Sequence, residues 1–437
     1  MRPLCSVGAG AGFAGDRIEP AVALAASGEV DAVVLECLAE RTLVAALRAR
    51  AASPEGGADP RLRRRLTPLI PAAAGRCRII SNLGAANPAA AARAAARLAS
   101  QLGRSGMRVA ALLGDDVAAL TDQVAWEAPI EGRLIGAHAY LGADGIAAAL
   151  ASGADMVLAG RVADSALFAA PALALGRPSD VLQAGALAVG HLLECGGQLT
   201  GGNFEPPGGG GLDAAAMAAL GYPLARIMAD GAAEIALLDG APGRLDPMTC
   251  TLQLLYEVHD PSRYITPDGV LDLTGIRFEQ TGYNRVRMTG AAVGPPPERL
   301  KVVAFVERRG VIADVEIGFA GSGALGLARR AADTLRLRLR DWADADLVID
   351  LVGVDSILGR ASAPLLAPPP EVRVHVSARC EDAEAAQAVE DEVYALTLCG
   401  PAGGGGIRSE RRPRIETISG LIPREMVPWT LAWETAA

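Results

Sequence analysis

Aromatic side chains and lysine are both scarce in this 437-residue chain. Only 4% of the residues are Phe, Trp or Tyr, so few rings are available to stack on the bases of a nucleotide. Lys301 is the only lysine. It opens an apolar, strand-like run rather than a phosphate-binding loop, so neither Schiff-base nor P-loop chemistry is predicted.

Long apolar runs, paired cysteines and a basic excess are absent as well. No apolar run approaches the roughly 20 uncharged residues of a membrane span, and the N-terminus lacks the apolar core of a signal peptide. The seven cysteines are scattered without CxxC spacing, which indicates a reducing, cytoplasmic compartment. The net charge of −9 argues against nucleic acid and anionic membranes as partners.

The first part of the chain alternates apolar strands with helical segments, which is typical of an α/β fold whose doubly wound, mostly parallel sheet is covered on both faces. Because aromatic residues are scarce, the core must be built from Ala, Val, Leu and Ile, which favours helices packed closely against a sheet. Strands are predicted at residues 3–7, 30–37, 78–82, 108–113 and 156–159, with helices near 16–26, 38–50, 88–101, 143–151, 164–170 and 181–194.

The texture becomes rich in short strands after about residue 250. The pattern predicts a hairpin of residues 301–308 and 311–319 that turns at Arg309-Gly310, followed by a helix, two strands and a second helix. This order is typical of a smaller α+β sandwich. We therefore predict two domains, residues 1–250 and residues 251–437.

Polar residues directly follow several of the predicted parallel strands, and ligands collect at the carboxyl edge of such a sheet. Glu36 lies at the end of the second strand and is a candidate catalytic acid or base. Asn82 ends the third strand, where its amide suits binding of a carbonyl or carboxylate group. Arg161 suits binding of a carboxylate or phosphate, and Asp164 either orients it in a catalytic role or caps the next helix.

A glycine loop near the N-terminus contains the pattern G-x-G-x-x-G at Gly10, Gly12 and Gly15. These glycines are candidate cofactor-binding residues because the pattern lets backbone N–H groups approach a pyrophosphate. Asp16 follows at once and places a carboxylate where the pyrophosphate charge would lie. Three interpretations stay open: a nucleotide site, a site for a small acid or thioester presented by Asp16 and Arg17, and a purely structural turn.

A second glycine loop, residues 196–211, carries Thr200 and Asn203 near its centre and is interpreted as a shaped substrate-binding site rather than a linker. The four histidines show no HExxH pattern, so no metal site is predicted. No cofactor is predicted either, beyond coenzyme A as part of a substrate.

Several motifs are long and specific: GAGAGFAGDR at residues 8–17, ISNLGAANP at 80–88 and QLTGGNF at 198–204. Through them nearly the whole chain resembles the acyclic terpene utilisation (AtuA) family, although Asn203 stands where that family often has an aromatic residue. The resemblance implies a place in the breakdown of branched acyclic terpenoids through acyl-CoA intermediates, and it favours a family-specific loop over a dinucleotide fingerprint. Longer members resemble this chain plus a ferredoxin-like segment of about one small domain, so we expect a separately encoded ferredoxin-like partner.

The leading hypothesis is a catabolic enzyme of the lyase or hydro-lyase type that acts on a branched carboxylate or its CoA thioester. Asp16 or Glu36, with a pKa raised by burial, would move the proton, and Arg161 or Arg17 would hold a carboxylate. Backbone N–H groups and Asn82 would stabilise the developing oxyanion. The alternatives are an NAD(P)-dependent oxidoreductase that uses the first glycine loop and a non-catalytic subunit of a multienzyme complex. We also expect a homo-oligomer.

Overall fold

The computed structural model describes residues 3–73, 75–175, 179–342, 346–359 and 367–437. Contacts divide the chain into two compact units, the first made of Met1–Pro129, Ile135–Ala304 and Ile418–Ala437, and the second of Ile130–Leu134 and Phe305–Thr417. The predicted boundary at residue 250 does not coincide with this division, because residues 251–304 contribute strands to the sheets of the first unit.

A ten-stranded sheet lies at the centre of the first unit, in the order β12-β13-β9-β8-β1-β2-β3-β7-β4-β19. The five strands from β1 to β4 in this order are parallel to one another, and the strands on either side are antiparallel. Every residue of β1, β2 and β7 is buried, which explains their unbroken apolar sequences. The strands are β1 Cys5–Ala11, β2 Ala32–Leu35, β3 Arg78–Ser81, β4 Arg108–Leu113, β7 Met156–Leu158, β8 Leu224–Ile227, β9 Ala233–Ala236, β12 Arg277–Gly282, β13 Arg285–Thr289 and β19 Thr430–Thr435.

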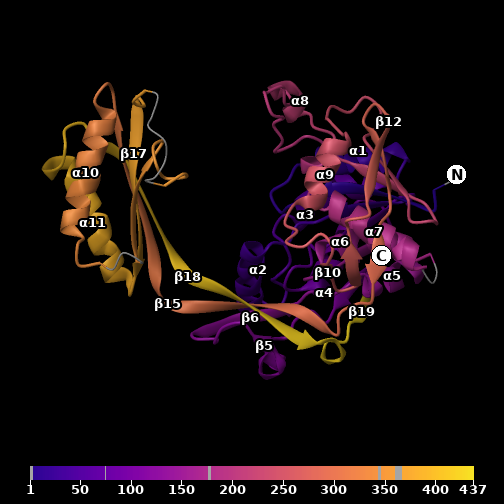
Figure 1. Cartoon of the computed structure of the whole chain (residues 1–437). Helices are drawn as coiled ribbons and strands as arrows, with labels where there is room; N and C mark the ends of the chain where they lie inside the picture. The colour runs from indigo at the N-terminus through magenta and orange to yellow at the C-terminus, as the bar shows by residue number, and fades with distance from the viewer. Residues whose placement is uncertain (1–2, 74, 176–178, 343–345, 360–366) are drawn as a thin grey trace. The chain divides into compact units, whose positions relative to one another are not determined.

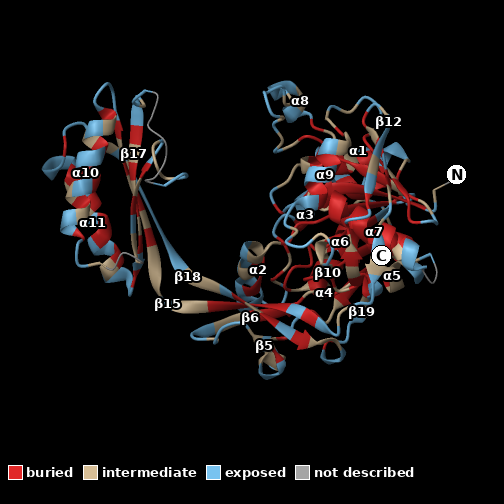
Figure 2. Ribbon diagram, viewed as in Figure 1, coloured by how far each residue is buried: buried red, intermediate tan, exposed pale blue. Residues whose placement is uncertain are grey.

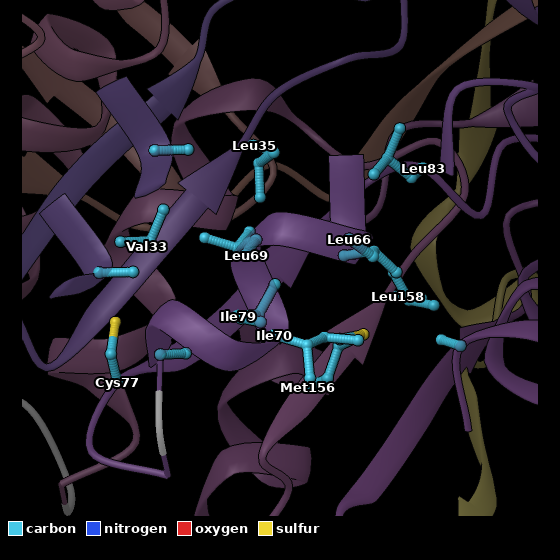
Figure 3. Close-up of a cluster of buried hydrophobic side chains, with 14 of the residues drawn as sticks. Val33, Leu35, Leu66, Leu69, Ile70, Cys77, Ile79, Leu83, Met156 and Leu158 are labelled. Carbon is cyan, nitrogen blue, oxygen red and sulfur yellow. The ribbon is translucent and has the colours of Figure 1, made fainter. Parts of the chain in front are cut away.

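Helices cover both faces of this sheet (Figure 1). On one face, α1 (Glu19–Ser27), α3 (Leu62–Ala73) and α4 (Pro88–Gln101) pack against alternate strand residues such as Val33 and Ile79 (Figure 3). On the other face, α5 (Asp144–Ala151), α6 (Asp164–Leu173) and α7 (Asp180–Leu193) contact the same strands and β8.

A smaller sheet in the first unit has the order β10-β11-β14 and adjoins α7. Its strands are β10 Tyr264–Thr266, β11 Gly269–Asp272 and β14 Ala292–Gly294.

The remaining elements are α2 Glu40–Ala52, η1 Ala118–Gln123, β5 Ala125–Trp126, β6 Arg133–Ala139, η2 Gly196–Gln198, α8 Ala214–Ala218, α9 Pro247–Leu255 and η3 Arg424–Met426. Among the helices that the structure describes, none combines the length and apolarity needed to cross a bilayer.

The second unit packs two helices against one face of an antiparallel sheet, and buried residues of both layers form one core. Figure 2 marks the buried residues of these elements in red. The elements are β15 Arg299–Ala320, α10 Ala324–Arg338, β16 Leu347–Val352, β17 Glu371–Cys380, α11 Ala383–Cys399 and β18 Gly405–Pro423. Residues 299–304 of β15 and residues 418–423 of β18 belong to the first unit.

The predicted mixed α/β class is confirmed, but the predicted hairpin at Arg309-Gly310 is wrong. Residues 299–320 form one continuous strand. Gly310 has a φ of 93°, and a Cβ there would lie 2.1 Å from the carbonyl oxygen of Cys380. The glycine therefore marks a close approach of β15 to β17 and not a chain reversal.

Candidate functional site

A cavity of about 250 Å³ in the first unit lies beside the loop that follows the carboxyl end of β7. A larger cavity of about 690 Å³ lies at the opposite edge of the sheet, where β1, β2 and β3 begin. Ligands of open α/β sheets bind outside the carboxyl ends of the strands, so the smaller cavity is the candidate site. It is lined by Tyr140, Ala163, Asp164, Ser165, Glu194, Glu257, Tyr264, Ile265, Thr266, Pro267, Pro297, Arg299, Leu300, Lys301 and Leu421.

The helix pair α6–α7 brings two carboxyl groups to this cavity. Asp164 is the first residue of α6, and Glu194 directly follows α7, so the antiparallel packing of the helices places both at one end. A Cβ on Gly190 would lie 2.3 Å from the carbonyl oxygen of Ser165. Only glycine permits α7 to pack this closely on α6, and the position of Glu194 depends on that packing.

Asp164 is held by Arg161, whose guanidinium donates to its carboxylate and to the carbonyl oxygens of Leu38 and Val162. The side chain of Asp164 is 40% exposed and faces the cavity, whereas that of Arg161 is 3% exposed. Burial raises the pKa of Asp164, and the charge of Arg161 opposes this rise. Because protein acceptors already use its donors, Arg161 is better suited to positioning Asp164 than to the ligand contact expected from the sequence.

Two cations from distant parts of the chain lie over the ring of Tyr140. The guanidinium carbon of Arg161 is 4.6 Å and the ammonium of Lys301 is 4.9 Å from the ring centroid. The hydroxyl of Tyr140 donates to Glu40 at 2.8 Å, and its backbone N–H donates to the carbonyl oxygen of Lys301 at 2.9 Å. This backbone pairing explains how Lys301, set aside in the sequence interpretation, reaches the cavity.

Glu36 and Asn82 lie behind Asp164 and do not line the cavity. The amide of Asn82 donates to Glu36 at 2.9 Å and accepts from the N–H of Cys37 at 2.7 Å. Burial raises the pKa of Glu36 to about 8; the charge of Asp164 adds to this rise and that of Arg161 opposes it. The residues that the sequence predicts at the strand ends do lie close together: Glu36, Asn82, Arg161 and Asp164. Only Asp164 among them lines the cavity.

Glu194 shares a proton with a histidine one helical turn earlier. The Nε2 of His191 lies 3.1 Å from the carbonyl oxygen of Leu254, an acceptor only, so Nε2 carries a hydrogen. The Nδ1 of His191 lies 3.0 Å from a carboxyl oxygen of Glu194. A hydrogen bond between these two atoms requires one further proton, carried either by the imidazole or by the carboxyl group. Burial raises the pKa of Glu194 to about 7, and His191 opposes the rise. The ring of Tyr264 lies 4.7 Å from that of His191.

The first glycine loop is closed by its own carboxylate. Asp16 accepts hydrogen bonds from the N–H groups of Gly12 and Arg17, each at 2.8 Å, and from the hydroxyl of Tyr222. The guanidinium of Arg17 donates to the carbonyl oxygen of Leu220 at 3.2 Å. The N–H of Gly12 that a pyrophosphate would use thus already has an acceptor, and none of these residues lines the cavity.

Packing accounts for the glycines of this loop. A Cβ on Gly10 would lie 2.7 Å from the side chain of Val33, and one on Gly12 would lie 2.5 Å from the backbone of Cys195. Neither these two nor Gly15 has a positive φ. Close approach to neighbouring segments explains the spacing without a nucleotide, so the geometry favours the structural interpretation of the loop.

Thr200 and Asn203, the substrate-binding candidates of the second glycine loop, do not line the cavity either. Thr200 is fully buried, and its hydroxyl donates to the carbonyl oxygen of Gly221 at 2.7 Å. Asn203 is exposed with a φ of 53°, and its amide lies 3.5 Å from Gln198. Both contacts stabilise the loop itself.

Sequence reasoning missed most of the cavity: Tyr140, Glu194, Tyr264, Arg299 and Lys301. Two signals pointed there. Lys301 is the only lysine, and Glu194 follows His191 by three residues, a spacing that places both on one side of a helix. In the described part of the chain, no three His, Cys, Asp or Glu side chains come together in a way that could hold a metal ion.

A family model described as acyclic terpene utilisation family protein AtuA matches residues 5–433. The chain belongs to the AtuA family. This confirms the resemblance found in the sequence motifs and associates the chain with acyclic terpene utilisation. No curated protein and no solved structure matches this AtuA-family chain.

Proposed function

We propose that this AtuA-family chain is a catabolic enzyme of the lyase or hydro-lyase type that acts on a branched carboxylate or its CoA thioester. The observation that carries the proposal is that Asp164 and Glu194 line one cavity from the ends of two packed helices. Each has a different partner, a guanidinium for Asp164 and an imidazole for Glu194. Two carboxyl groups in unlike surroundings suit the separate tasks of base and acid.

In this proposal Asp164 is the base. Contact with the guanidinium of Arg161 favours its carboxylate form. It removes a proton from the carbon next to the substrate carbonyl, and the electron pair of that C–H bond forms the new double bond. Arg161 is then a positioning residue, since it touches Asp164 and not the substrate.

Glu194 is the acid. A carboxyl group with a pKa of about 7 holds a transferable proton at neutral pH. It protonates the β-hydroxyl as the C–O bond breaks, and the hydroxyl leaves as water. The proton between His191 and Glu194 leaves with the water, so Glu194 regains its proton from solvent and Asp164 releases to solvent the proton that it took from carbon. The reverse sequence hydrates a double bond.

The size of the cavity supports a small acyl group as the reacting part. Its volume of about 250 Å³ is below the range of roughly 300–1,000 Å³ that holds drug-sized ligands. A branched acyl group suits such a volume, and the nucleotide of a CoA thioester would remain outside. Membership of the AtuA family supports the same substrate class.

An NAD(P)-dependent oxidoreductase is less well supported, because Asp16 takes the N–H of Gly12 that the dinucleotide fingerprint would use. The alternative that is not an enzyme is a non-catalytic subunit of a multienzyme complex. It predicts no turnover by the chain alone or with a copurifying partner.

The test is a screen of branched hydroxy acids and acyl-CoA thioesters read by mass spectrometry. For an active pair we expect Asp164→Asn and Glu194→Gln each to lower kcat by about 10²–10⁴-fold, the usual contribution of general acid–base catalysis. Glu279→Gln, an exposed residue of β12, is the matched control and should leave kcat unchanged. Full activity in both cavity variants, or no turnover of any compound, would reject the proposal.

A further inference from the structure

The cavity contains two cations on the same face of one strand. Arg299 and Lys301 begin β15, and residues two apart in a strand point to the same side. Both line the cavity together with Asp164 and Glu194. Two positive charges beside two carboxyl groups raise the question of what these cations bind.

Neither cation is paired with a carboxylate among the residues that the structure describes, although most arginines of the first unit have such a partner or a carbonyl acceptor. Lys301 lies over the ring of Tyr140, which fixes its ammonium without neutralising its charge. Burial raises the pKa of Glu40, but a backbone N–H, the hydroxyl of Tyr140 and the charge of Arg161 lower it, and the charge of Lys301 adds a smaller lowering effect. Arg299 is exposed, and no aromatic ring lies against its guanidinium among the described residues.

We propose that Arg299 and Lys301 together bind the carboxylate of a branched small acid and so set the orientation in which it meets Asp164 and Glu194. This inference rests on the proposed function for the site but concerns binding, which can be measured without turnover. A planar carboxylate suits one guanidinium and one ammonium, since the guanidinium offers paired donors and the ammonium a point charge. A CoA thioester lacks this carboxylate at the reacting end, so the inference selects the free acid.

The single lysine permits a direct binding experiment on the full chain. Acetylation by an amine-specific reagent modifies only Lys301 and the N-terminal amine, and mass spectrometry of peptides separates the two. The probes are isovalerate, its neutral amide isovaleramide, isovaleryl-CoA and inorganic phosphate. We expect isovalerate to slow acetylation of Lys301 at least tenfold while the N-terminal amine is unaffected, and isovaleramide to give no protection.

We call Arg299 and Lys301 together the carboxylate clamp. Variants of these two residues test the clamp through the affinity of the chain for isovalerate. Lys301→Met and Arg299→Met should each raise the Kd for isovalerate at least tenfold, whereas Lys301→Arg should recover most of the affinity. Arg287→Met, an exposed arginine of β13, is the matched control and should leave the Kd unchanged. Circular dichroism and the melting temperature show that each variant is folded.

The outcomes separate this inference from the proposed function. Protection by isovalerate with no turnover of any acid supports the clamp and rejects the enzyme. Turnover that keeps its KM in both methionine variants rejects the clamp and leaves the enzyme standing. Protection by phosphate or isovaleryl-CoA but not by isovalerate would show that the cations bind phosphate groups, which also overturns the inference.

Discussion

The carboxylate of Asp16 accepts a hydrogen bond from the backbone N–H of Gly12 at 2.8 Å. The contact spans the part of the glycine loop that resembles a dinucleotide fingerprint. Two further donors, the N–H of Arg17 and the hydroxyl of Tyr222, bind the same carboxylate. These three hydrogen bonds to Asp16 stabilise the loop. They lead to one prediction for the stability of the fold and one for the binding of nicotinamide dinucleotides.

Removing the carboxylate should destabilise the fold. Asp16→Ala leaves three donors without their acceptor, and we expect it to lower the free energy of unfolding by about 3 kcal/mol. Tyr222→Phe removes only one of the three contacts and should cost about 1 kcal/mol. Urea unfolding followed by circular dichroism measures both. Equal stability of Asp16→Ala and the wild type would show that the loop does not depend on this carboxylate.

The same contact predicts weak or no binding of nicotinamide dinucleotides. Calorimetric titration of the full chain with NAD(H) and NADP(H) should give no heat of binding, and neither compound should raise the melting temperature, since a ligand of the folded state stabilises it. Asp16→Asn serves as the comparison, because it removes the negative charge. A micromolar Kd for the wild type would restore the oxidoreductase hypothesis.

The proton shared by His191 and Glu194 predicts a specific pH dependence of turnover. The acid form of Glu194 is lost as the pH rises through about 7, so kcat/KM for the dehydration should fall above that pH. His191 lowers the pKa of Glu194, and His191→Asn should therefore move this inflection to higher pH. His375→Asn, in the second unit, is the control and should not move it. An inflection that persists unchanged in Glu194→Gln would assign it to another group.

Much of the central sheet could be predicted, because β2, β3, β4 and β7 are short apolar runs whose local sequence alone indicates buried parallel strands. The antiparallel additions could not. Leu431 of β19 pairs with Leu112 of β4, and no local pattern indicates a partner so distant in sequence.

The candidate site, like the sheet, could be predicted from the sequence only in part. Asp164 was found because it follows a strand, and its neighbours Glu36 and Asn82 were found for the same reason. Lys301 was missed because it reaches the cavity through a backbone hydrogen bond between Tyr140 and a strand far along the chain. Spacing within one segment carries no information about such a pairing. Whether a strand-end carboxylate faces a cavity or lies behind it, as Asp164 and Glu36 do, also depends on packing that spacing does not reveal.

A buried carboxyl group next to the cavity predicts a pH-dependent stability. Asp268 is 8% exposed; its Oδ1 accepts from the N–H of Ala143 at 2.8 Å, and its Oδ2 has no partner in the described part of the chain. Burial raises the pKa of Asp268 to about 6; the Ala143 N–H and Arg424 oppose this rise, and Asp144 adds to it.

The sign follows from proton binding. The folded state binds the Asp268 proton more tightly than the unfolded state, so this group's contribution is complete below the ordinary pKa of 3.8 and is lost as the pH rises to about 6. The loss amounts to about 3 kcal/mol at about 1.4 kcal/mol per pKa unit. Between pH 4 and pH 8, Asp268→Asn should therefore gain about 2.4 kcal/mol relative to the wild type, because part of the contribution is already lost at pH 4. Urea unfolding at the two pH values measures this, Asp122→Asn is the exposed control, and a constant difference would contradict the assignment.

Gly190 fixes the distance between the two helices that carry the candidate acid and base. In Gly190→Ala the new Cβ would meet the backbone oxygen of Ser165 at 2.3 Å, which cannot be relieved by a side-chain rotation. We expect a loss of about 2–3 kcal/mol in the free energy of unfolding, as for other overpacked cores, and a lower kcat because Glu194 moves with α7. The matched control is Gly326→Ala in α10, where a Cβ has nothing within 4 Å. That change should instead stabilise its helix by about 0.5–1 kcal/mol, because alanine loses less backbone entropy on folding. Thermal and urea unfolding of the two variants side by side separate the effect of close packing from that of helix propensity, and equal stabilisation of both would refute the close contact of α6 and α7.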